Sequence, residues 1–310
     1  MKEPDRSEIW PSLPLDAWRD TYATLHMWSQ VIGKIRLARA PMLNHWWQVT
    51  LYVTARGLTT SPIPYGARTF QIDFDFITHR LGIETSQGEE RTFELGSYSV
   101  AEFYARVMAA MAELGLDVKI WTHPVEVVES IPFEQDRQHA SYDPDYANRV
   151  WRILVQADRV LHEFRSGFLG KASPVHFFWG GFDLALTFFS GRRAPPHPGG
   201  LPNVGDWVNQ EAYSHECSST GFWPGSGAIQ EPAFYAYAYP EPDGYKVYPV
   251  QPEPAFYSPE MGLFILRYED VRSAADPDAA LLAFFRSTHA AGAALAGWDR
   301  AALEREPSAG

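Results

Sequence analysis

A repeated pattern constrains the fold of this chain more than any other feature of its sequence. The segment Trp46-Trp47-Gln48-Val49-Thr50-Leu51-Tyr52-Val53-Thr54 aligns without a gap on Trp179-Gly180-Gly181-Phe182-Asp183-Leu184-Ala185-Leu186-Thr187, with one tryptophan, one leucine and one threonine in register. Further along, Phe93-Glu94-Leu95 matches Phe264-Ile265-Leu266. We therefore predict two related units with a pocket between them, since ligand sites often form where two units meet.

Changes in the spacing of apolar residues predict both helices and strands. Apolar residues recur at three- and four-residue steps in four helix-like segments, which cover 15–38, 100–114, 145–168 and 277–298. Apolar and polar residues alternate in the strand-like segments 45–54, 70–76, 177–189 and 234–239. We expect an α+β fold built from an internally duplicated unit of helix, antiparallel strands and helix, whose pseudo-twofold sheets are covered by helices.

The same patterns divide the chain into parts. Residues 1–123 form the predicted first repeat, 124–144 the linker and 145–310 the second repeat. The second repeat carries an insertion at about 191–232 that is rich in proline, glycine and aromatic residues. Long insertions in compact domains are usually functional or disordered, and this one is too aromatic for simple disorder. We interpret it as a folded lid or pocket wall.

Charge and composition exclude several classes of partner. The chain has 310 residues and a formal net charge of −12, so it lacks the basic surface that nucleic acids and anionic membranes require. The first residues carry charges rather than an apolar stretch, and no apolar run is long enough to span a bilayer. We expect a cytoplasmic protein, and the sequence leaves its oligomeric state open.

No cofactor or metal is indicated by the motifs. Cys217 is the single cysteine, which rules out an intrachain disulfide and a cysteine-rich zinc site. The chain has no glycine-rich nucleotide loop, no His-Glu-x-x-His and no nucleophile elbow. A metal held by His176, His215 and Glu216 stays an open alternative.

Aromatic residues stand out, with 11 Trp, 15 Tyr and 19 Phe. They predict either a large aromatic core or a ring-lined cavity for a small-molecule ligand. Strand alternation places Asp73 and Asp75 on one polar face, about 7 Å apart, where each would raise the pKa of the other. A solvated sheet face is the alternative. The candidate substrate-binding residues are Trp46, Tyr52, Asp73, Asp75, Trp179, Trp223 and Tyr237.

Candidate acid–base residues fall in the second repeat. His215 and Glu216 lie in a polar cluster with Tyr213 and Cys217, and a histidine beside a glutamate can act as a base. His176 directly precedes a predicted strand. Each histidine has the alternative interpretation of a structural residue. The candidate catalytic set is His176, Asp183, His215 and Glu216.

Several motifs of this chain are similar to those of an uncharacterised bacterial family of unknown function. They are Asn44-His45-Trp46-Trp47, Arg56-Gly57-Leu58-Thr59-Thr60, Ser173-Pro174-Val175-His176-Phe177-Phe178-Trp179-Gly180, Tyr213-Ser214-His215-Glu216 and Gly221-Phe222-Trp223-Pro224-Gly225. The resemblance covers nearly the whole chain and implies no activity.

Three functions are consistent with these patterns. The first is a cofactor-free acid–base enzyme of hydrolase or lyase type, acting on a small apolar or aromatic molecule. The second is a non-catalytic protein that binds a small molecule in the same pocket. The third is a structural protein whose exposed tyrosines form an interface.

Overall fold

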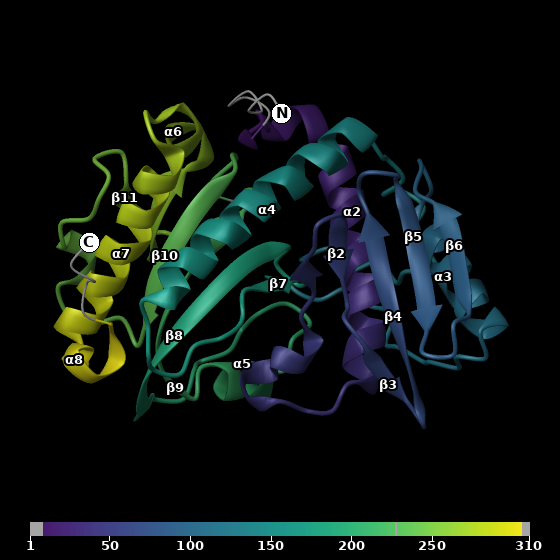
Figure 1. The fold of residues 1–310 in the computed structure, drawn as a ribbon, viewed down its shortest axis with the longest axis horizontal. Helices are drawn as coiled ribbons and strands as arrows, with labels where there is room; N and C mark the ends of the chain where they lie inside the picture. Colours follow the sequence, from purple (N-terminus) through teal and green to yellow (C-terminus); the bar gives the residue numbers. More distant parts are fainter. Residues whose placement is uncertain (1–8, 227, 306–310) are drawn as a thin grey trace.

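Two antiparallel sheets and the helices against them make up the protein (Figure 1). The computed structural model describes residues 9–226 and 228–305. The N-terminal sheet has the strand order β1-β2-β4-β5-β6, with β3 paired to β4, and the C-terminal sheet has the order β11-β12-β10-β9-β8-β7. The predicted α+β fold class is confirmed.

The N-terminal sheet packs its apolar face against two helices. In β4, Phe70, Ile72 and Phe74 are buried, while the polar residues between them are half-buried on the opposite face. The rings of Phe74 and Phe103 stack with centroids 6.2 Å apart, which joins the sheet to α3. The elements of this part are α2 (Leu15–Arg39), η1 (Asn44–Val49), β1 (Tyr52–Val53), β2 (Gly57–Thr59), β3 (Ile63–Tyr65), β4 (Arg68–Asp75), β5 (Arg80–Thr85), β6 (Glu90–Glu94) and α3 (Val100–Glu113).

The C-terminal sheet is covered on one face by α4 and α7. Leu184, Leu186 and Phe188 point to this side and are buried, and Phe188 contacts Phe164 of α4 at 4.9 Å between ring centroids. The elements of this part are α4 (Pro144–Ser166), β7 (His176–Phe178), β8 (Asp183–Arg193), α5 (Asp206–Ala212), β9 (His215–Trp223), β10 (Ala233–Tyr239), η2 (Tyr245–Val247), β11 (Phe256–Ser258), β12 (Leu263–Arg267), α6 (Tyr268–Ser273), α7 (Pro277–Leu295) and α8 (Arg300–Leu303).

Capping residues fix where two of the helices begin. Ser99 and Glu102 form a reciprocal capping box at the start of α3. Asp143 accepts backbone hydrogen bonds from Asp145 and Tyr146, and Pro144 occupies the first turn of α4, where its missing N–H costs nothing.

The two sheets meet at one backbone bridge. The amide of Leu51 donates to the Phe177 carbonyl at 2.9 Å, and the amide of Phe177 donates to the Leu51 carbonyl at 2.8 Å. The bridge therefore places the segments just before β1 and in β7 side by side. Both parts run from a helix through antiparallel strands to further helices. The internal duplication and its boundaries remain a prediction.

Two predicted strands differ from their expected bounds. Residues Asn44–Val49 form η1, with left-handed φ angles of 59° at His45 and 64° at Trp46, so only Tyr52–Val53 remains as strand. The predicted strand 177–189 is interrupted by a turn at 179–182. The Trp179 ring at the start of this turn packs on Gly33, where a Cβ would lie 2.2 Å from the ring.

Candidate functional site

A cavity of about 680 Å³ lies on the face of the C-terminal sheet that is opposite α4 and α7. We call it the aromatic cavity. Because side chains alternate along a strand, alternate residues in parts of β8, β9 and β10 face it. These floor residues are Asp183, Ala185, Thr187, Phe189, Cys217, Ser219, Trp223, Tyr235 and Tyr237. The volume falls within the range of small-molecule sites.

Segments from distant parts of the sequence form the walls. Residues 201–213, which include α5, come from the insertion, and Trp46 of η1 faces them. The Trp46 and Trp207 rings lie 4.9 Å apart, which joins η1 to α5. The segment 121–126 and Lys34 of α2 also line the cavity. Both parts of the chain therefore contribute to one hollow.

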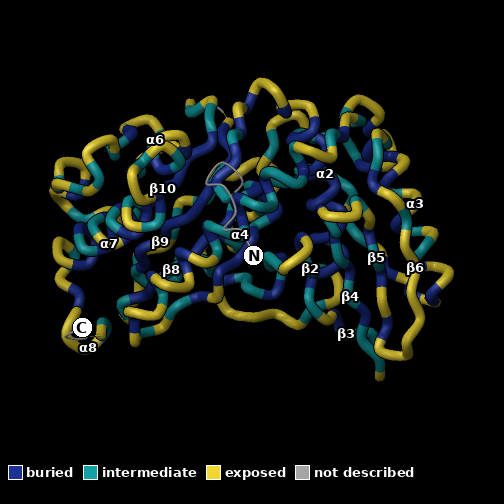
Figure 2. Tube along the Cα trace, turned by 45° about the horizontal axis from the view of Figure 1, so that its top comes forward, coloured by how far each residue is buried: buried dark blue, intermediate teal, exposed yellow. Residues whose placement is uncertain are grey.

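Within residues 9–226 and 228–305, the outer face of the N-terminal sheet is less covered than the cavity side of the C-terminal sheet. Figure 2 shows the backbone of β6 exposed at the edge of the molecule, while much of β9 and β10 is buried. In this sheet the residues of β4 and β5 that point away from the core are half-buried or exposed. The two sheets thus share an alternating pattern but differ in what lies over the polar face.

Asp183 is the half-buried carboxyl group on the cavity floor. Its Oδ2 accepts a hydrogen bond of 2.5 Å from the Tyr235 hydroxyl. Desolvation raises the pKa of Asp183 to about 6, although the hydrogen bond from Tyr235 lowers it. Gly221 lies between the two partners on β9, and a Cβ there would lie 2.7 Å from the Tyr235 hydroxyl. The missing side chain of Gly221 therefore permits the contact.

Glu126 is a second cavity carboxyl group close to Asp183. A Cβ placed on Gly181 would lie 3.0 Å from Asp183 Oδ1 and 3.6 Å from Glu126 Oε2, so the two groups flank this glycine. Surrounding protein desolvates Glu126 and, together with the charge of Asp183, raises its pKa to about 7. Glu126 is nevertheless an exposed residue, and it belongs to the cavity lining.

Backbone contacts hold Glu126 in place. Gln30 donates to the Val125 carbonyl at 2.8 Å and accepts from the Val125 amide at 2.8 Å. The backbone amide of Glu126 donates a hydrogen bond to the Pro202 carbonyl oxygen, and Glu126 itself has a left-handed φ of 60°. A non-glycine residue in this conformation persists only where its surroundings enforce it. Glu126 is not among the predicted site residues, because it lies in the predicted linker and no local motif singles it out.

Five of the predicted site residues line the cavity. Asp183 lies on its floor, and the indole and phenol rings of Trp46, Trp179, Trp223 and Tyr237 line it. The Tyr237 hydroxyl lies 2.7 Å from that of Tyr213. The structure thus brings together the residues predicted from the two aligned tryptophans and from the tyrosine-rich strand.

The predicted histidines and Glu216 lie outside the lining of this cavity. His176 is buried among Trp47, Tyr52 and Phe178, and burial together with Arg36 and Arg165 lowers its pKa to about 3. Tyr52 therefore packs on His176 and also lies outside the cavity lining.

His215 and Glu216 interact with neighbours elsewhere. Glu216 accepts hydrogen bonds from Ser190 and Arg192 on the opposite face of β9. His215 lies 3.1 Å from the Ser214 hydroxyl and close to the His45 ring. The structure does not assemble the predicted catalytic set, and among its members only Asp183 lines the aromatic cavity.

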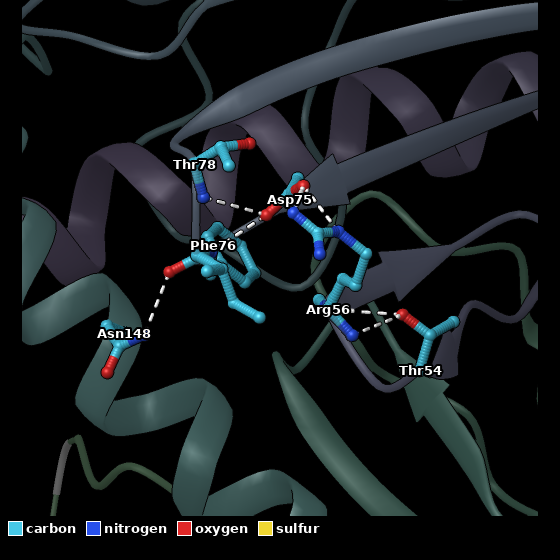
Figure 3. Close-up of polar contacts among 8 residues, drawn as sticks. Thr54, Arg56, Asp75, Phe76, Thr78 and Asn148 are labelled. Carbon is cyan, nitrogen blue, oxygen red and sulfur yellow. Dashed lines mark hydrogen bonds and ion pairs between the residues drawn. The ribbon is translucent and has the colours of Figure 1, made fainter.

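Asp73 and Asp75 belong to the N-terminal sheet, away from the cavity lining. Asp75 accepts from the backbone of Ile77 and Thr78 and pairs with Arg56 at 2.7 Å (Figure 3). Burial raises its pKa, but these hydrogen bonds outweigh it and leave the pKa lowered. The prediction that the two aspartates raise each other's pKa is wrong for Asp75. Asp73 accepts from Gln71 at 2.8 Å.

The described part of the chain contains no group of three His, Cys, Asp or Glu side chains arranged to hold a metal ion. Among the helices of residues 9–226 and 228–305, none has the length and apolar character needed to cross a membrane. The thiol of Cys217 lies on the cavity floor, where burial raises its pKa to about 12, so it is a poor nucleophile near neutral pH.

Fold and cavity define an α+β protein with two antiparallel sheets, one of which forms the floor of an aromatic cavity. The chain belongs to DUF5996, a family of unknown function whose model matches residues 10–305. This confirms the resemblance to a family of unknown function. Comparisons with curated proteins and with solved structures gave no match.

Proposed function

We propose that the protein is a cofactor-free acid–base enzyme that acts on a small, largely apolar molecule in the aromatic cavity. One observation carries this proposal: two neighbouring carboxyl groups, Asp183 and Glu126, face a ring-lined hollow and have raised pKa values. General acid–base catalysis is most efficient when the pKa of the catalytic group lies near the working pH.

The different environments of the two carboxyl groups favour one as the proton donor and the other as the proton acceptor. Asp183 accepts the hydrogen bond from Tyr235, which favours its ionised form. Glu126 has the higher pKa and is destabilised further as an anion by Asp183. When two nearby carboxyl groups share one proton, the proton stays mainly on the group of higher pKa. Glu126 then supplies a proton to a bound molecule, and Asp183 accepts one.

A non-catalytic binding protein is the second candidate, favoured by polar donors in the cavity wall that lack partners. The indole Nε1 of Trp46 and the amide Nδ2 of Asn209 have no hydrogen-bond acceptor among the described residues. Both residues line the cavity, so a bound molecule that reached these donors would satisfy them whether or not it reacted.

The test combines binding and turnover. Small aromatic and aliphatic compounds are screened by their effect on the melting temperature of the protein, and each compound that stabilises it is followed by NMR for conversion. Glu126→Gln and Asp183→Asn are each expected to lower turnover by about 10²-fold or more while still binding the compound.

Two controls define the outcomes. Ala185→Leu places extra bulk on the cavity floor and is expected to remove both binding and turnover. Asp75→Asn changes a carboxylate outside the cavity and should leave both unchanged. Binding without any conversion by the unaltered protein would contradict the enzyme and support the binding protein.

A further inference from the structure

We infer that the aromatic cavity takes a molecule with an apolar body and a single carboxylate, and that Lys34 pairs with the carboxylate. This inference rests on the proposed function and names the class of molecule bound at that site. It is carried by an unpaired lysine, by two further donors and by an apolar rim.

Lys34 is a buried cation without an anionic partner. It is 3% exposed and lines the cavity from the C-terminal half of α2. Its ammonium lies 4.6 Å from the ring centroid of Trp121 and 5.8 Å from that of Trp179. Among the described residues the Lys34 ammonium forms no ion pair and no hydrogen bond. Burial alone lowers the pKa of Lys34 to about 8.

Such an arrangement is unfavourable in the empty protein. Lysine is almost never fully buried unless it is paired, because removing its charge from water is costly. Two aromatic faces offset part of this cost by cation–π interaction. All three N–H groups of the ammonium remain available for an acceptor, and a ligand in the cavity is placed to supply one.

Other groups in the lining favour an acceptor-rich ligand end. Asn209 is 4% exposed, and its Nδ2 has no partner among the described residues. The same holds for Nε1 of Trp46. In contrast, the hydroxyl groups of Thr187 and Ser219 bond to each other at 2.9 Å and so need no ligand. Among the described residues, the fully buried side-chain atoms of the lining that lack a partner are therefore donors.

The charge balance favours one negative charge over two. Lys34 is the only Lys or Arg among the residues that line the cavity in the described part of the chain. A phosphate monoester near neutral pH would bring about two negative charges and leave one uncompensated in a low-dielectric site. A monocarboxylate brings a single negative charge, the smallest that can pair with Lys34 in a lining that already holds the carboxyl groups of Asp183 and Glu126.

An apolar rim fits the body of such a molecule. Trp121, Leu201 and Trp207 line the cavity and are 56%, 41% and 62% exposed. Exposed apolar groups gathered at a hollow often mark a ligand site. Because Lys34 lies against Trp121, its ammonium is close to this rim and can meet a carboxylate there.

Three probes with one carbon skeleton test the inference. Phenylbutyrate, phenylbutanol and phenylbutylamine are titrated by calorimetry at about pH 6.5, where the lysine is protonated and the probe acid is ionised. The protein is expected to bind phenylbutyrate at least about tenfold more tightly than the alcohol, since a hydrogen bond to a charged group is worth this much or more. Binding of the amine is expected to be weakest.

Lys34→Met removes the charge and keeps much of the side-chain length. It is expected to abolish the preference for the acid over the alcohol while the alcohol still binds. Lys119→Met alters an exposed lysine outside the lining and should preserve the preference. Persistence of the preference in Lys34→Met would overturn the assignment of Lys34.

The remaining outcomes separate this inference from the proposed function. Equal binding of the acid and the alcohol by the unaltered protein overturns the carboxylate and leaves the acid–base site untouched. Absence of binding by all three probes overturns the ligand class. A different result would contradict the proposed function: turnover that is unchanged in Glu126→Gln.

Discussion

The Tyr235 hydroxyl reaches across a whole strand to donate a hydrogen bond to Asp183. Tyr235 belongs to β10 and Asp183 to β8, with β9 between them, and the bond of 2.5 Å passes over Gly221. Neighbouring strands lie about 4.8 Å apart, so the contact spans two strand spacings. A tyrosine is long enough for this, provided that the residue between has no side chain.

Gly221→Ala is expected to disrupt this contact. The new Cβ would lie 1.9 Å from the Leu184 carbonyl oxygen and 2.7 Å from the Tyr235 hydroxyl, so the backbone must shift. We expect a loss of about 2–3 kcal/mol in the free energy of unfolding, measured by urea denaturation. Gly82→Ala is the matched control, because its nearest neighbour would be 3.8 Å away. Equal effects of the two substitutions would contradict the steric argument.

Tyr235→Phe is expected to make stability depend more strongly on pH. The hydrogen bond from Tyr235 lowers the pKa of Asp183, so its removal raises that pKa above about 6. The folded protein then resists ionisation of Asp183, and the variant loses about 1–3 kcal/mol above this pKa and less below it. Denaturation at about pH 5 and pH 8 measures the difference. Tyr237→Phe, which instead loses its contact with Tyr213, should show no such pH dependence.

Glu126→Gln is expected to stabilise the protein in mildly alkaline solution. The pKa of Glu126 is 4.5 in the unfolded reference and about 7 in the fold. Its contribution to stability is therefore present below pH 4.5 and is lost as the pH rises through about 7. Because the cavity admits solvent, we expect a gain on the order of 1 kcal/mol at about pH 8. The exposed Glu129→Gln serves as the control, and a parallel change in both variants would refute a specific role.

His176→Leu tests whether this histidine is structural. Both ring nitrogens lack a hydrogen-bond partner among the described residues, and the pKa falls from 6.5 to about 3. The folded state excludes the charged ring, so His176 costs stability as the pH falls below 6.5 towards 3. The variant should gain about 3 kcal/mol relative to the unaltered protein between about pH 7 and pH 4. If turnover is lost and stability is unchanged, the predicted catalytic role holds instead.

Local signals in the sequence predicted much of the C-terminal sheet face. Strict alternation on β10 placed Tyr235 and Tyr237 on one side, and the aligned segment placed Asp183 and Thr187 on the same side. Two-residue periodicity is a property of the extended backbone, so it survives in any fold that keeps the strand. Ser99 fixed the start of α3 for the same reason, because a capping box needs only four consecutive residues.

The sequence by itself therefore determined the α+β class, the starts of the four predicted helices and the face on which the side chains of β8 and β10 lie, since each depends on neighbours along the chain. It did not show that residues 215–223 of the predicted insertion form β9, which contributes further side chains to the cavity floor. Only the tertiary structure decided that Glu126 lies beside Asp183, that Lys34 faces the cavity without a partner and that His176 is enclosed by rings. Those placements arise from packing between residues far apart in sequence. No local periodicity encodes which distant segment covers which face, so the covered sheet and the solvated one could not be distinguished from their alternation.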